Sequence, residues 1–206
     1  MRVAVLCEFS GIVRDAFIRA GHYAISCDLL PTESPGPHIQ GDLRDYDWSD
    51  YDLIIAHPPC TYLSYAGRAW WYRTGRAEKR KDALALFMYC YNLPRKRICI
   101  ENPYGYPQEA FRMYDQKIQP YYFGDPAQKT ICLWLKELPP LIYAFQDELF
   151  MGKTAVEKPI LGRWPNGKRK NYVDIQNNWD REECRKNRSR FFPGIAVAMA
   201  DQWGRL

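Results

Sequence analysis

Apolar and polar positions alternate in blocks along the first hundred residues. Two segments, 12–20 and 78–91, space their apolar residues three and four positions apart, which predicts helices. Polar residues gather directly after short apolar runs of strand length, and these runs cover residues 3–7, 23–27, 52–56 and 97–100. Strands that alternate with helices predict a doubly wound α/β domain with a mostly parallel, Rossmann-like sheet. Such sheets bind ligands at the carboxyl ends of their strands.

The pattern weakens after residue 104. Residues 118–123 and 130–135 have strand character and predict an antiparallel edge pair. The apolar, Ala-rich segment 193–203 begins with proline, which predicts a closing helix. We therefore expect three parts: a core at 1–140, a small basic insertion at 141–189, and a closing segment at 190–206 that returns to the core.

Composition excludes several classes of protein. The 206 residues are 47% hydrophobic, which is enough for a buried core. No apolar run reaches the roughly 18 residues of a membrane helix, and Glu8 interrupts the amino terminus too early for a signal peptide. The seven cysteines never form a C-x-x-C pair. This argues against a disulfide framework or a metal site and favours a cytoplasmic protein.

Charge is divided unevenly along the chain. Residues 1–150 carry 17 Lys and Arg against 18 Asp and Glu, whereas residues 151–206 carry 12 against 6. Basic blocks at 168–170 and 185–190 would attract a polyanion through counterion release. A solvated surface explains either block alone equally well, and the clustering favours nucleic acid.

Three residues after the first strands suggest a ligand site. Gly11 lies between the first strand and helix, where a ligand approaches the backbone and free helix amides. Asp28 ends the second strand, where such folds place an acid that binds ribose hydroxyls. Asp42 ends the third strand. Each residue alone is also explained by a turn or a cap.

Pro58-Pro59-Cys60 follows the buried strand at 52–56. Two prolines fix the backbone and aim the next side chain. A cysteine held in this way is a candidate nucleophile, although an average cysteine is a buried structural residue.

Glu101 follows the apolar residues 98–100 in the corresponding place on the next strand. Poor solvation there would raise the pKa of the carboxyl and make it a proton donor. A glutamate that caps the neighbouring turn is the alternative. Because Cys60 and Glu101 come from successive strands, we expect both to face one cleft.

Aromatic and basic residues are interleaved after Cys60. Trp70, Trp71 and Tyr72 stand among Arg68 and Arg73. Such side chains suit base stacking and phosphate contact. Packing of the two tryptophans under the following helix is an equally good interpretation.

Taken in order, these motifs resemble the cytosine carbon-5 DNA methyltransferase family. The resemblance covers residues 1–103 and the closing helix. Its motifs are Phe9-Ser10-Gly11, Asp28, Gly41-Asp42, Pro58-Pro59-Cys60 and Glu101-Asn102. The specific part is the Pro-Pro-Cys turn with a downstream Glu-Asn. His57 stands where the family has glycine. The resemblance implies a Rossmann-like methyltransferase fold, S-adenosylmethionine as cofactor and no metal.

The resemblance also implies roles for individual residues. Cys60 would add to carbon 6 of cytosine, and Glu101 would hold and protonate nitrogen 3. Asp28 would bind the ribose of the cofactor and Asp42 its adenine. The implied cofactor-binding residues are Phe9, Ser10, Gly11, Asp28, Asp42 and Pro58. The implied substrate-binding residues are Pro59, Ser64, Asn102 and Lys129, the last in place of a family arginine.

The family has a sizeable target-recognition domain before its last helix, and this chain has about fifty residues there. It therefore resembles short, phage-type members that act on DNA in a host cytoplasm. Three alternatives stay open: the same chemistry on a cytidine nucleotide or a single strand, methylation of the exocyclic amine, and a non-catalytic protein that binds cofactor or nucleic acid.

Overall fold

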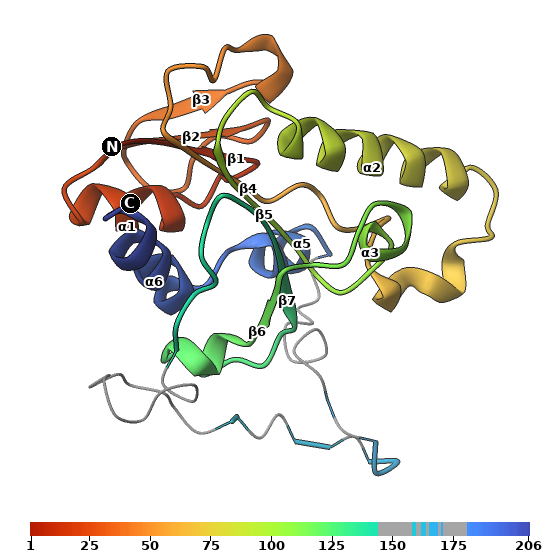
Figure 1. Cartoon of the computed structure of the whole chain (residues 1–206). Coiled ribbons are helices and arrows are strands. Elements are labelled where there is room, and N and C mark those ends of the chain that lie inside the picture. The colour runs from red at the N-terminus through yellow and green to blue at the C-terminus, as the bar shows by residue number, and fades with distance from the viewer. Residues whose placement is uncertain (144–157, 160–161, 164, 169, 171–180) are drawn as a thin grey trace.

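A seven-stranded sheet forms the centre of the computed structural model (Figure 1). The structure describes residues 1–143, 158–159, 162–163, 165–168, 170 and 181–206. The strand order is β3-β2-β1-β4-β5-β7-β6, and β7 alone runs against the others. The strands are β1 (Arg2–Leu6), β2 (Tyr23–Asp28), β3 (His38–Gln40), β4 (Leu53–Ala56), β5 (Arg97–Asn102), β6 (Gln116–Ile118) and β7 (Ile131–Lys136). This order confirms the predicted doubly wound, mostly parallel, Rossmann-like sheet.

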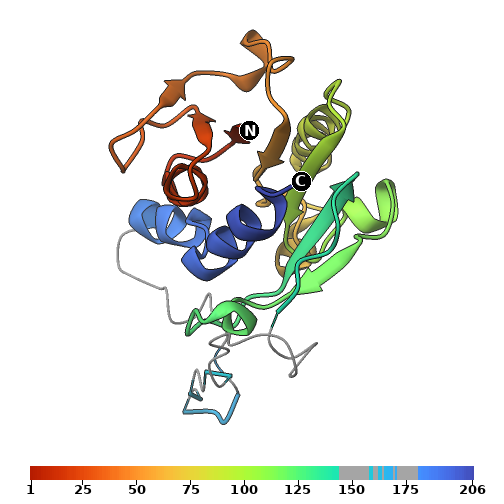
Figure 2. The same cartoon turned by 60° about the vertical axis from the view of Figure 1, so that its left-hand side comes forward.

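Helices cover both faces of the sheet (Figures 1 and 2). Helices α1 (Ile12–Arg19) and α6 (Pro193–Trp203) pack on one face, and α2 (Arg76–Tyr91) packs on the other. Along β1, Val3 and Val5 face the first pair, whereas Ala4 and Leu6 face α2. Because both faces are buried, the central strands are apolar at every position rather than at alternate ones.

Shorter elements complete the described chain. Helix α6 has the predicted bounds and returns to α1, with Ile195, Met199 and Trp203 fully buried. The remaining elements are η1 (Leu43–Asp45), η2 (Tyr65–Trp70), α3 (Pro107–Ala110), η3 (Pro120–Phe123) and α5 (Arg181–Ser189). None of the helices in the described part of the chain is long and apolar enough to cross a membrane.

Two local predictions were wrong. The strand expected at 118–123 ends at Ile118, and Pro120 starts η3 because proline has no N–H for a ladder. Glu101 and Asn102, expected to follow a strand, lie inside β5. There they pair with Leu133 and Cys132 of the antiparallel strand β7. Pairing with β7, about thirty residues further along the chain, extends β5 to Asn102. The local pattern at 97–100 does not indicate this pairing. The predicted antiparallel pair exists, with β6 at the edge.

Most of the insertion expected at 141–189, including Arg169 of the first basic block, lies outside the described residues. The second basic block lies on α5 and the link to α6. Two nitrogens of the Arg190 guanidinium, Nε and Nη2, donate to the Glu33 carboxylate at 2.7 and 2.8 Å. This ion pair holds the link beside the loop that follows β2.

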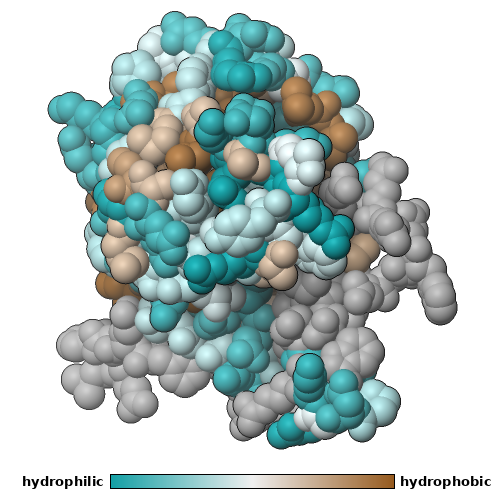
Figure 3. All heavy atoms as spheres, turned by 90° about the vertical axis from the view of Figure 1, so that its right-hand side faces the viewer, coloured by the Kyte–Doolittle hydropathy of each residue, from teal (hydrophilic) through white to brown (hydrophobic). Residues whose placement is uncertain are grey.

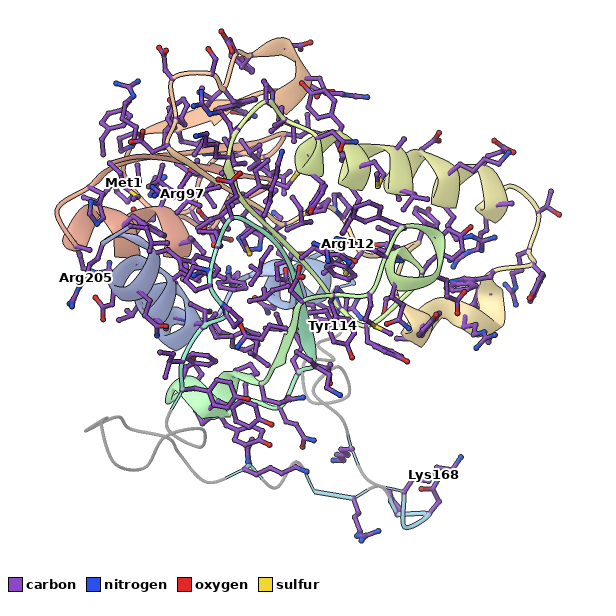
Figure 4. The ribbon with its side chains drawn as sticks, in the orientation of Figure 1. Met1, Arg97, Arg112, Tyr114, Lys168 and Arg205 are labelled. Atoms are coloured by element: carbon purple, nitrogen blue, oxygen red, sulfur yellow. The ribbon has the colours of Figure 1, made fainter. Side chains whose placement is uncertain are left out.

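The amino edge of the sheet lies at the chain ends. Figure 4 shows Met1, Arg97 and Arg205 on the same side of the molecule. Arg97 begins β5 and donates from Nη2 to the Leu206 carbonyl at 2.8 Å. The residues singled out from the sequence lie instead at or after the carboxyl ends of the strands.

Candidate active site at the carboxyl edge of the sheet

The Pro58-Pro59-Cys60 turn is tied to the strands on both sides of β4. The His57 amide donates to the Leu6 carbonyl of β1 at 2.9 Å. Asn102 Nδ2, at the end of β5, donates to the Pro58 carbonyl at 2.8 Å in a buried bond. Together with the two rigid prolines, this bond orients Cys60. Pro58 is buried, whereas Pro59 is exposed.

A second link holds the chain after Cys60. The Cys60 carbonyl accepts the amides of Leu63 and Ser64, at 3.0 and 2.9 Å. The Leu63 carbonyl accepts the Tyr106 amide at 2.7 Å. A Cβ on Gly105 would lie 2.2 Å from that carbonyl oxygen, so only glycine fits. Sequence analysis missed Gly105, because its requirement comes from a segment forty residues away.

Ser64 has a structural contact where a substrate contact was expected. Its Oγ accepts the Ala66 amide at 3.2 Å and caps η2. A cap of this kind fixes the start of a short helix. The serine therefore shapes the segment after Cys60.

Glu101 is buried and shares a hydrogen bond with His57. Its Oε2 lies 3.2 Å from His57 Nδ1, and its Oε1 is buried with no hydrogen-bond partner among the described residues. Burial raises the pKa of the carboxyl, but the His57 bond and the charges of Lys129 and His57 outweigh it. The pKa therefore lies below its ordinary value of 4.5. The predicted rise was wrong because His57 supplies a donor that the family's glycine lacks.

His57 is enclosed by the site. Its ring packs against Phe191 with centroids 4.6 Å apart. Its Nε2 is buried and has no hydrogen-bond partner in the described part of the chain. The His57 charge also acts on the Glu8 carboxyl, whose pKa is raised overall by burial. Sequence analysis noted His57 only as a departure from the family motif, and that departure was the available signal.

Cys60 lies within the electrostatic reach of Glu101 and Lys129. Burial raises the pKa of the Cys60 thiol and Glu101 adds to the rise, whereas Lys129 and Arg188 lower it. Lys129 is anchored by donating from Nζ to the Arg188 carbonyl at 3.1 Å. The structure thus gathers the two predicted catalytic side chains and Lys129 at one place.

The amino end of α1 is already occupied by a carboxylate. Glu8 accepts the amides of Val13 and Arg14, at 2.7 and 3.2 Å. Ser10 Oγ lies 3.4 Å from the Ile12 amide. The expectation that these helix amides are free for a ligand was therefore wrong for Val13 and Arg14.

Gly11 and Phe9 shape the same loop. Gly11 has φ +75°, and a Cβ there would lie 2.4 Å from Arg14 Nη2. Phe9 is buried, and its carbonyl accepts the Glu33 amide at 2.9 Å. Both residues bring the loop after β1 against the loop after β2.

Arg14 holds the loop that follows β2, and sequence analysis missed it. Its side chain is fully buried. It donates to Ser26 Oγ at 3.1 Å, to Thr32 Oγ1 at 3.2 Å and to the Ser34 carbonyl at 2.9 Å. It also pairs with Asp15 at 2.7 Å. A buried arginine with this many partners fixes the backbone around it.

The two acids expected at the cofactor, Asp28 and Asp42, both act electrostatically on Cys27. Burial, and to a smaller extent the charges of these two acids, raise the pKa of the Cys27 thiol to about 12. Asp28 accepts the Leu30 amide at 2.9 Å, and burial raises the pKa of its carboxyl. Asp42 accepts the Arg44 amide and guanidinium, at 3.0 and 2.9 Å. Those bonds lower the pKa of Asp42 to about 2.

No protein-family model and no curated protein matches this sequence. Solved structures with a similar fold include the following three. They are the methyltransferase EhMeth of Entamoeba histolytica (TM-score 0.49, 13% identity, 78% of this chain and 58% of that one), Dnmt2 of S. pombe (0.46, 18%, 88% and 62%) and a DNMT2 mutant of Spodoptera frugiperda (0.43, 15%, 87% and 60%). The chain spans about three fifths of the length of these proteins. Likenesses this weak assign no activity, so the function must be inferred from the site.

Proposed function

We propose that this protein is an S-adenosylmethionine-dependent methyltransferase that acts on carbon 5 of cytosine in DNA through a covalent adduct with Cys60. The observation that carries the proposal is the pairing of Cys60 with Glu101 at the ends of adjacent strands. Glu101 Oε1 is buried and has no hydrogen-bond partner among the described residues. Such an acceptor is costly unless a ligand satisfies it. It suits the polar edge of a base.

The loop after β1 supports S-adenosylmethionine rather than a dinucleotide. Glu8 takes the amides that a phosphate would use, so an anion would meet a carboxylate there. A sulfonium compound is cationic and carries ribose hydroxyls, which suit Glu8 and Asp28. When bound, it supplies the methyl group that carbon 5 receives. The residues that would hold it are Phe9, Ser10, Gly11, Asp28, Asp42 and Pro58.

Cys60 acts as the nucleophile. At rest its thiol is protonated, since burial raises its pKa, and the charges of Lys129 and Arg188 favour loss of the proton to water. Attack of Sγ on carbon 6 forms a C–S bond and moves the electron pair of the 5,6 double bond onto the ring, which makes carbon 5 nucleophilic. After methylation, carbon 5 loses its proton to water, and the electron pair left behind re-forms the 5,6 double bond and expels Cys60 as the thiolate.

Glu101 holds the ring at nitrogen 3 while Cys60 adds. His57 Nδ1 lies 3.2 Å from Glu101 Oε2. We infer that the Glu101 carboxyl takes up a proton from water as the base binds, gives it to nitrogen 3 as the ring accepts electrons, and takes it back on elimination. Asn102 keeps the Pro58 carbonyl, and with it Cys60, in register with Glu101.

The test is transfer of a radiolabelled methyl group from S-adenosylmethionine to duplex DNA, single-stranded DNA, RNA and cytidine nucleotides. Cys60→Ala should lower the rate by at least about a thousandfold and Glu101→Gln by about a hundredfold or more, because each removes a group that acts on the ring. Calorimetry should find cofactor affinity unchanged in both. Cys90→Ala, a buried cysteine on α2, is the matched control.

Product analysis separates the alternatives. DNA with 5-fluorocytosine should trap wild type as a protein–DNA adduct seen by mass spectrometry, since fluorine cannot leave as a proton does. Methyl transfer that survives Cys60→Ala, or a product methylated on the exocyclic amine, would contradict the proposed chemistry. Cofactor binding without transfer to any acceptor would favour a non-catalytic binding protein. Membership of the short, phage-type group, the domain boundaries and a cytoplasmic location stay predictions.

A further inference from the structure

The segment that follows Cys60 is locally the most basic part of the core. Residues 61–82 contain six Arg or Lys against two acids. Comparing residues 1–150 with residues 151–206 does not reveal this local excess. This segment comprises η2 and the first turns of α2. We give the name arginine–aromatic surface to the exposed Trp70, Tyr72, Arg73 and Lys79 together with the half-buried Tyr62 and Arg76. Figure 3 shows that this side of the molecule is covered mostly by hydrophilic and weakly polar side chains.

The two neighbouring tryptophans have different environments. Trp71 is 7% exposed and packs edge-on against Tyr106 at 5.7 Å. Trp70 is 45% exposed and Tyr72 is 90% exposed. Packing in the core is thus confirmed for Trp71 and wrong for Trp70, and base stacking by Trp70 stays a prediction. Trp71 belongs to the core, whereas the exposed rings of Trp70 and Tyr72 contribute little to it.

Cations lie over the rings of this surface. The Arg73 guanidinium is 3.7 Å from the centroid of the Trp70 ring. Arg76 and Lys79 approach the Tyr62 ring at 5.4 and 5.7 Å. Ring planes stack on bases, and guanidinium and ammonium groups contact phosphates, so alternation of the two is the chemistry of a single-strand groove.

The surface is joined rigidly to Cys60. Tyr62 follows Cys60 by two residues, and the Cys60 carbonyl fixes the intervening turn. Gly105 and the Tyr106 amide hold Leu63 against the loop after β5. A strand lying on the surface is therefore at a fixed distance from the nucleophile.

We propose that the arginine–aromatic surface binds an unpaired DNA strand that flanks the target cytosine. The identity of the strand rests on the proposed function, whereas binding itself needs no methyl transfer. In a duplex the base faces are stacked on one another, and only edges are presented in the grooves. Exposed tryptophan and tyrosine rings gain contact only with bases whose faces are free. The surface therefore selects unpaired over paired DNA.

The test is fluorescence anisotropy of a labelled 20-nucleotide DNA strand, its duplex and the same sequence in RNA, with the full chain and no cofactor. Wild type should bind the single DNA strand at least tenfold more tightly than the duplex. Trp70→Ala should weaken single-strand binding by about tenfold through lost stacking. Arg73→Gln should reduce the slope of log K against log salt by about 0.7.

Tyr23→Ala is the matched control, because this ring is 48% exposed and carries Arg2 at 4.9 Å, but lies at the amino edge. It should bind as wild type does. Duplex binding as tight as single-strand binding, RNA binding tighter than DNA binding, or Trp70→Ala without effect would each overturn the inference. Cys60→Ala should bind the strand normally. The anisotropy assay therefore reports failure of strand binding, and the radiolabel assay independently reports failure of methyl transfer.

Discussion

The carboxyl edge of the sheet has two halves, in which the acidic side chains differ in burial and in hydrogen bonding. At β4 and β5, Glu101 is buried and keeps one oxygen without a partner among the described residues. At β2 and β3, Asp42 is partly exposed and its oxygens bind Arg44. A buried acceptor with unmet hydrogen-bonding capacity is prepared for a reacting group, because nothing has to leave before that group binds. A satisfied surface acid must first exchange its partner.

The halves are also held by different means. Contacts to backbone carbonyls hold the β4–β5 half: the Asn102 side chain binds the Pro58 carbonyl, and Gly105 lies against the Leu63 carbonyl. One buried side chain, Arg14, holds the β1–β3 half. Substitutions in one half should therefore leave the function of the other intact, and three predictions test this separation.

Arg14→Met should have the largest effect on stability. The substitution removes the buried guanidinium, its ion pair with Asp15 and its hydrogen bonds to the loop after β2. We expect a loss of about 3 kcal/mol in the free energy of unfolding, measured by urea denaturation, and weaker cofactor binding. Arg19→Met, on the exposed end of α1, should change little. Equal losses in the two variants would remove the assigned role of Arg14.

Gly105→Ala should affect the other half alone. The added Cβ would meet the Leu63 carbonyl and displace the segment after Cys60. We expect kcat to fall by about tenfold or more, since misplacement of about 1 Å costs up to a hundredfold, with cofactor affinity unchanged in calorimetry. Gly67→Ala, whose Cβ would meet its nearest atom at 3.6 Å, is the control. Loss of cofactor binding in Gly105→Ala would show that the halves are coupled.

His57→Phe should produce the smallest effect, a change in pH dependence. In wild type the pKa of Glu101 lies below 4.5, so its contribution to stability is present above about pH 4.5 and is lost as pH falls through the lowered value. In His57→Phe burial acts without the histidine and raises that pKa, so stability is lost instead as pH rises. Urea unfolding between about pH 2.5 and pH 8 measures the sign of this dependence. His57→Gln keeps a donor and should behave as wild type does; identical profiles in all three proteins would exclude the pairing.

The local pattern predicted an element well where its periodicity is strong and its ends do not depend on pairing with a distant segment. The bounds of α6 match the predicted Pro193–Trp203, and β4 falls within the predicted run at 52–56. The prediction failed at β5, which ends at Asn102 because β7 pairs with it. It also failed at Pro120, where a missing N–H ended the strand.

By itself the sequence determined the layered sheet, the position of Cys60 in the turn after β4 and that of Glu101 near the end of the adjacent strand. These follow from local properties: the spacing of apolar residues and the rigidity of two prolines. Only the tertiary structure decided that the pKa of Glu101 is lowered rather than raised, because its partner His57 lies 44 positions away in the chain. It likewise decided the roles of Arg14 and Gly105, whose constraints come from segments distant in the chain. Burial and charge at a site are sums over such distant contacts, so no local pattern carries them.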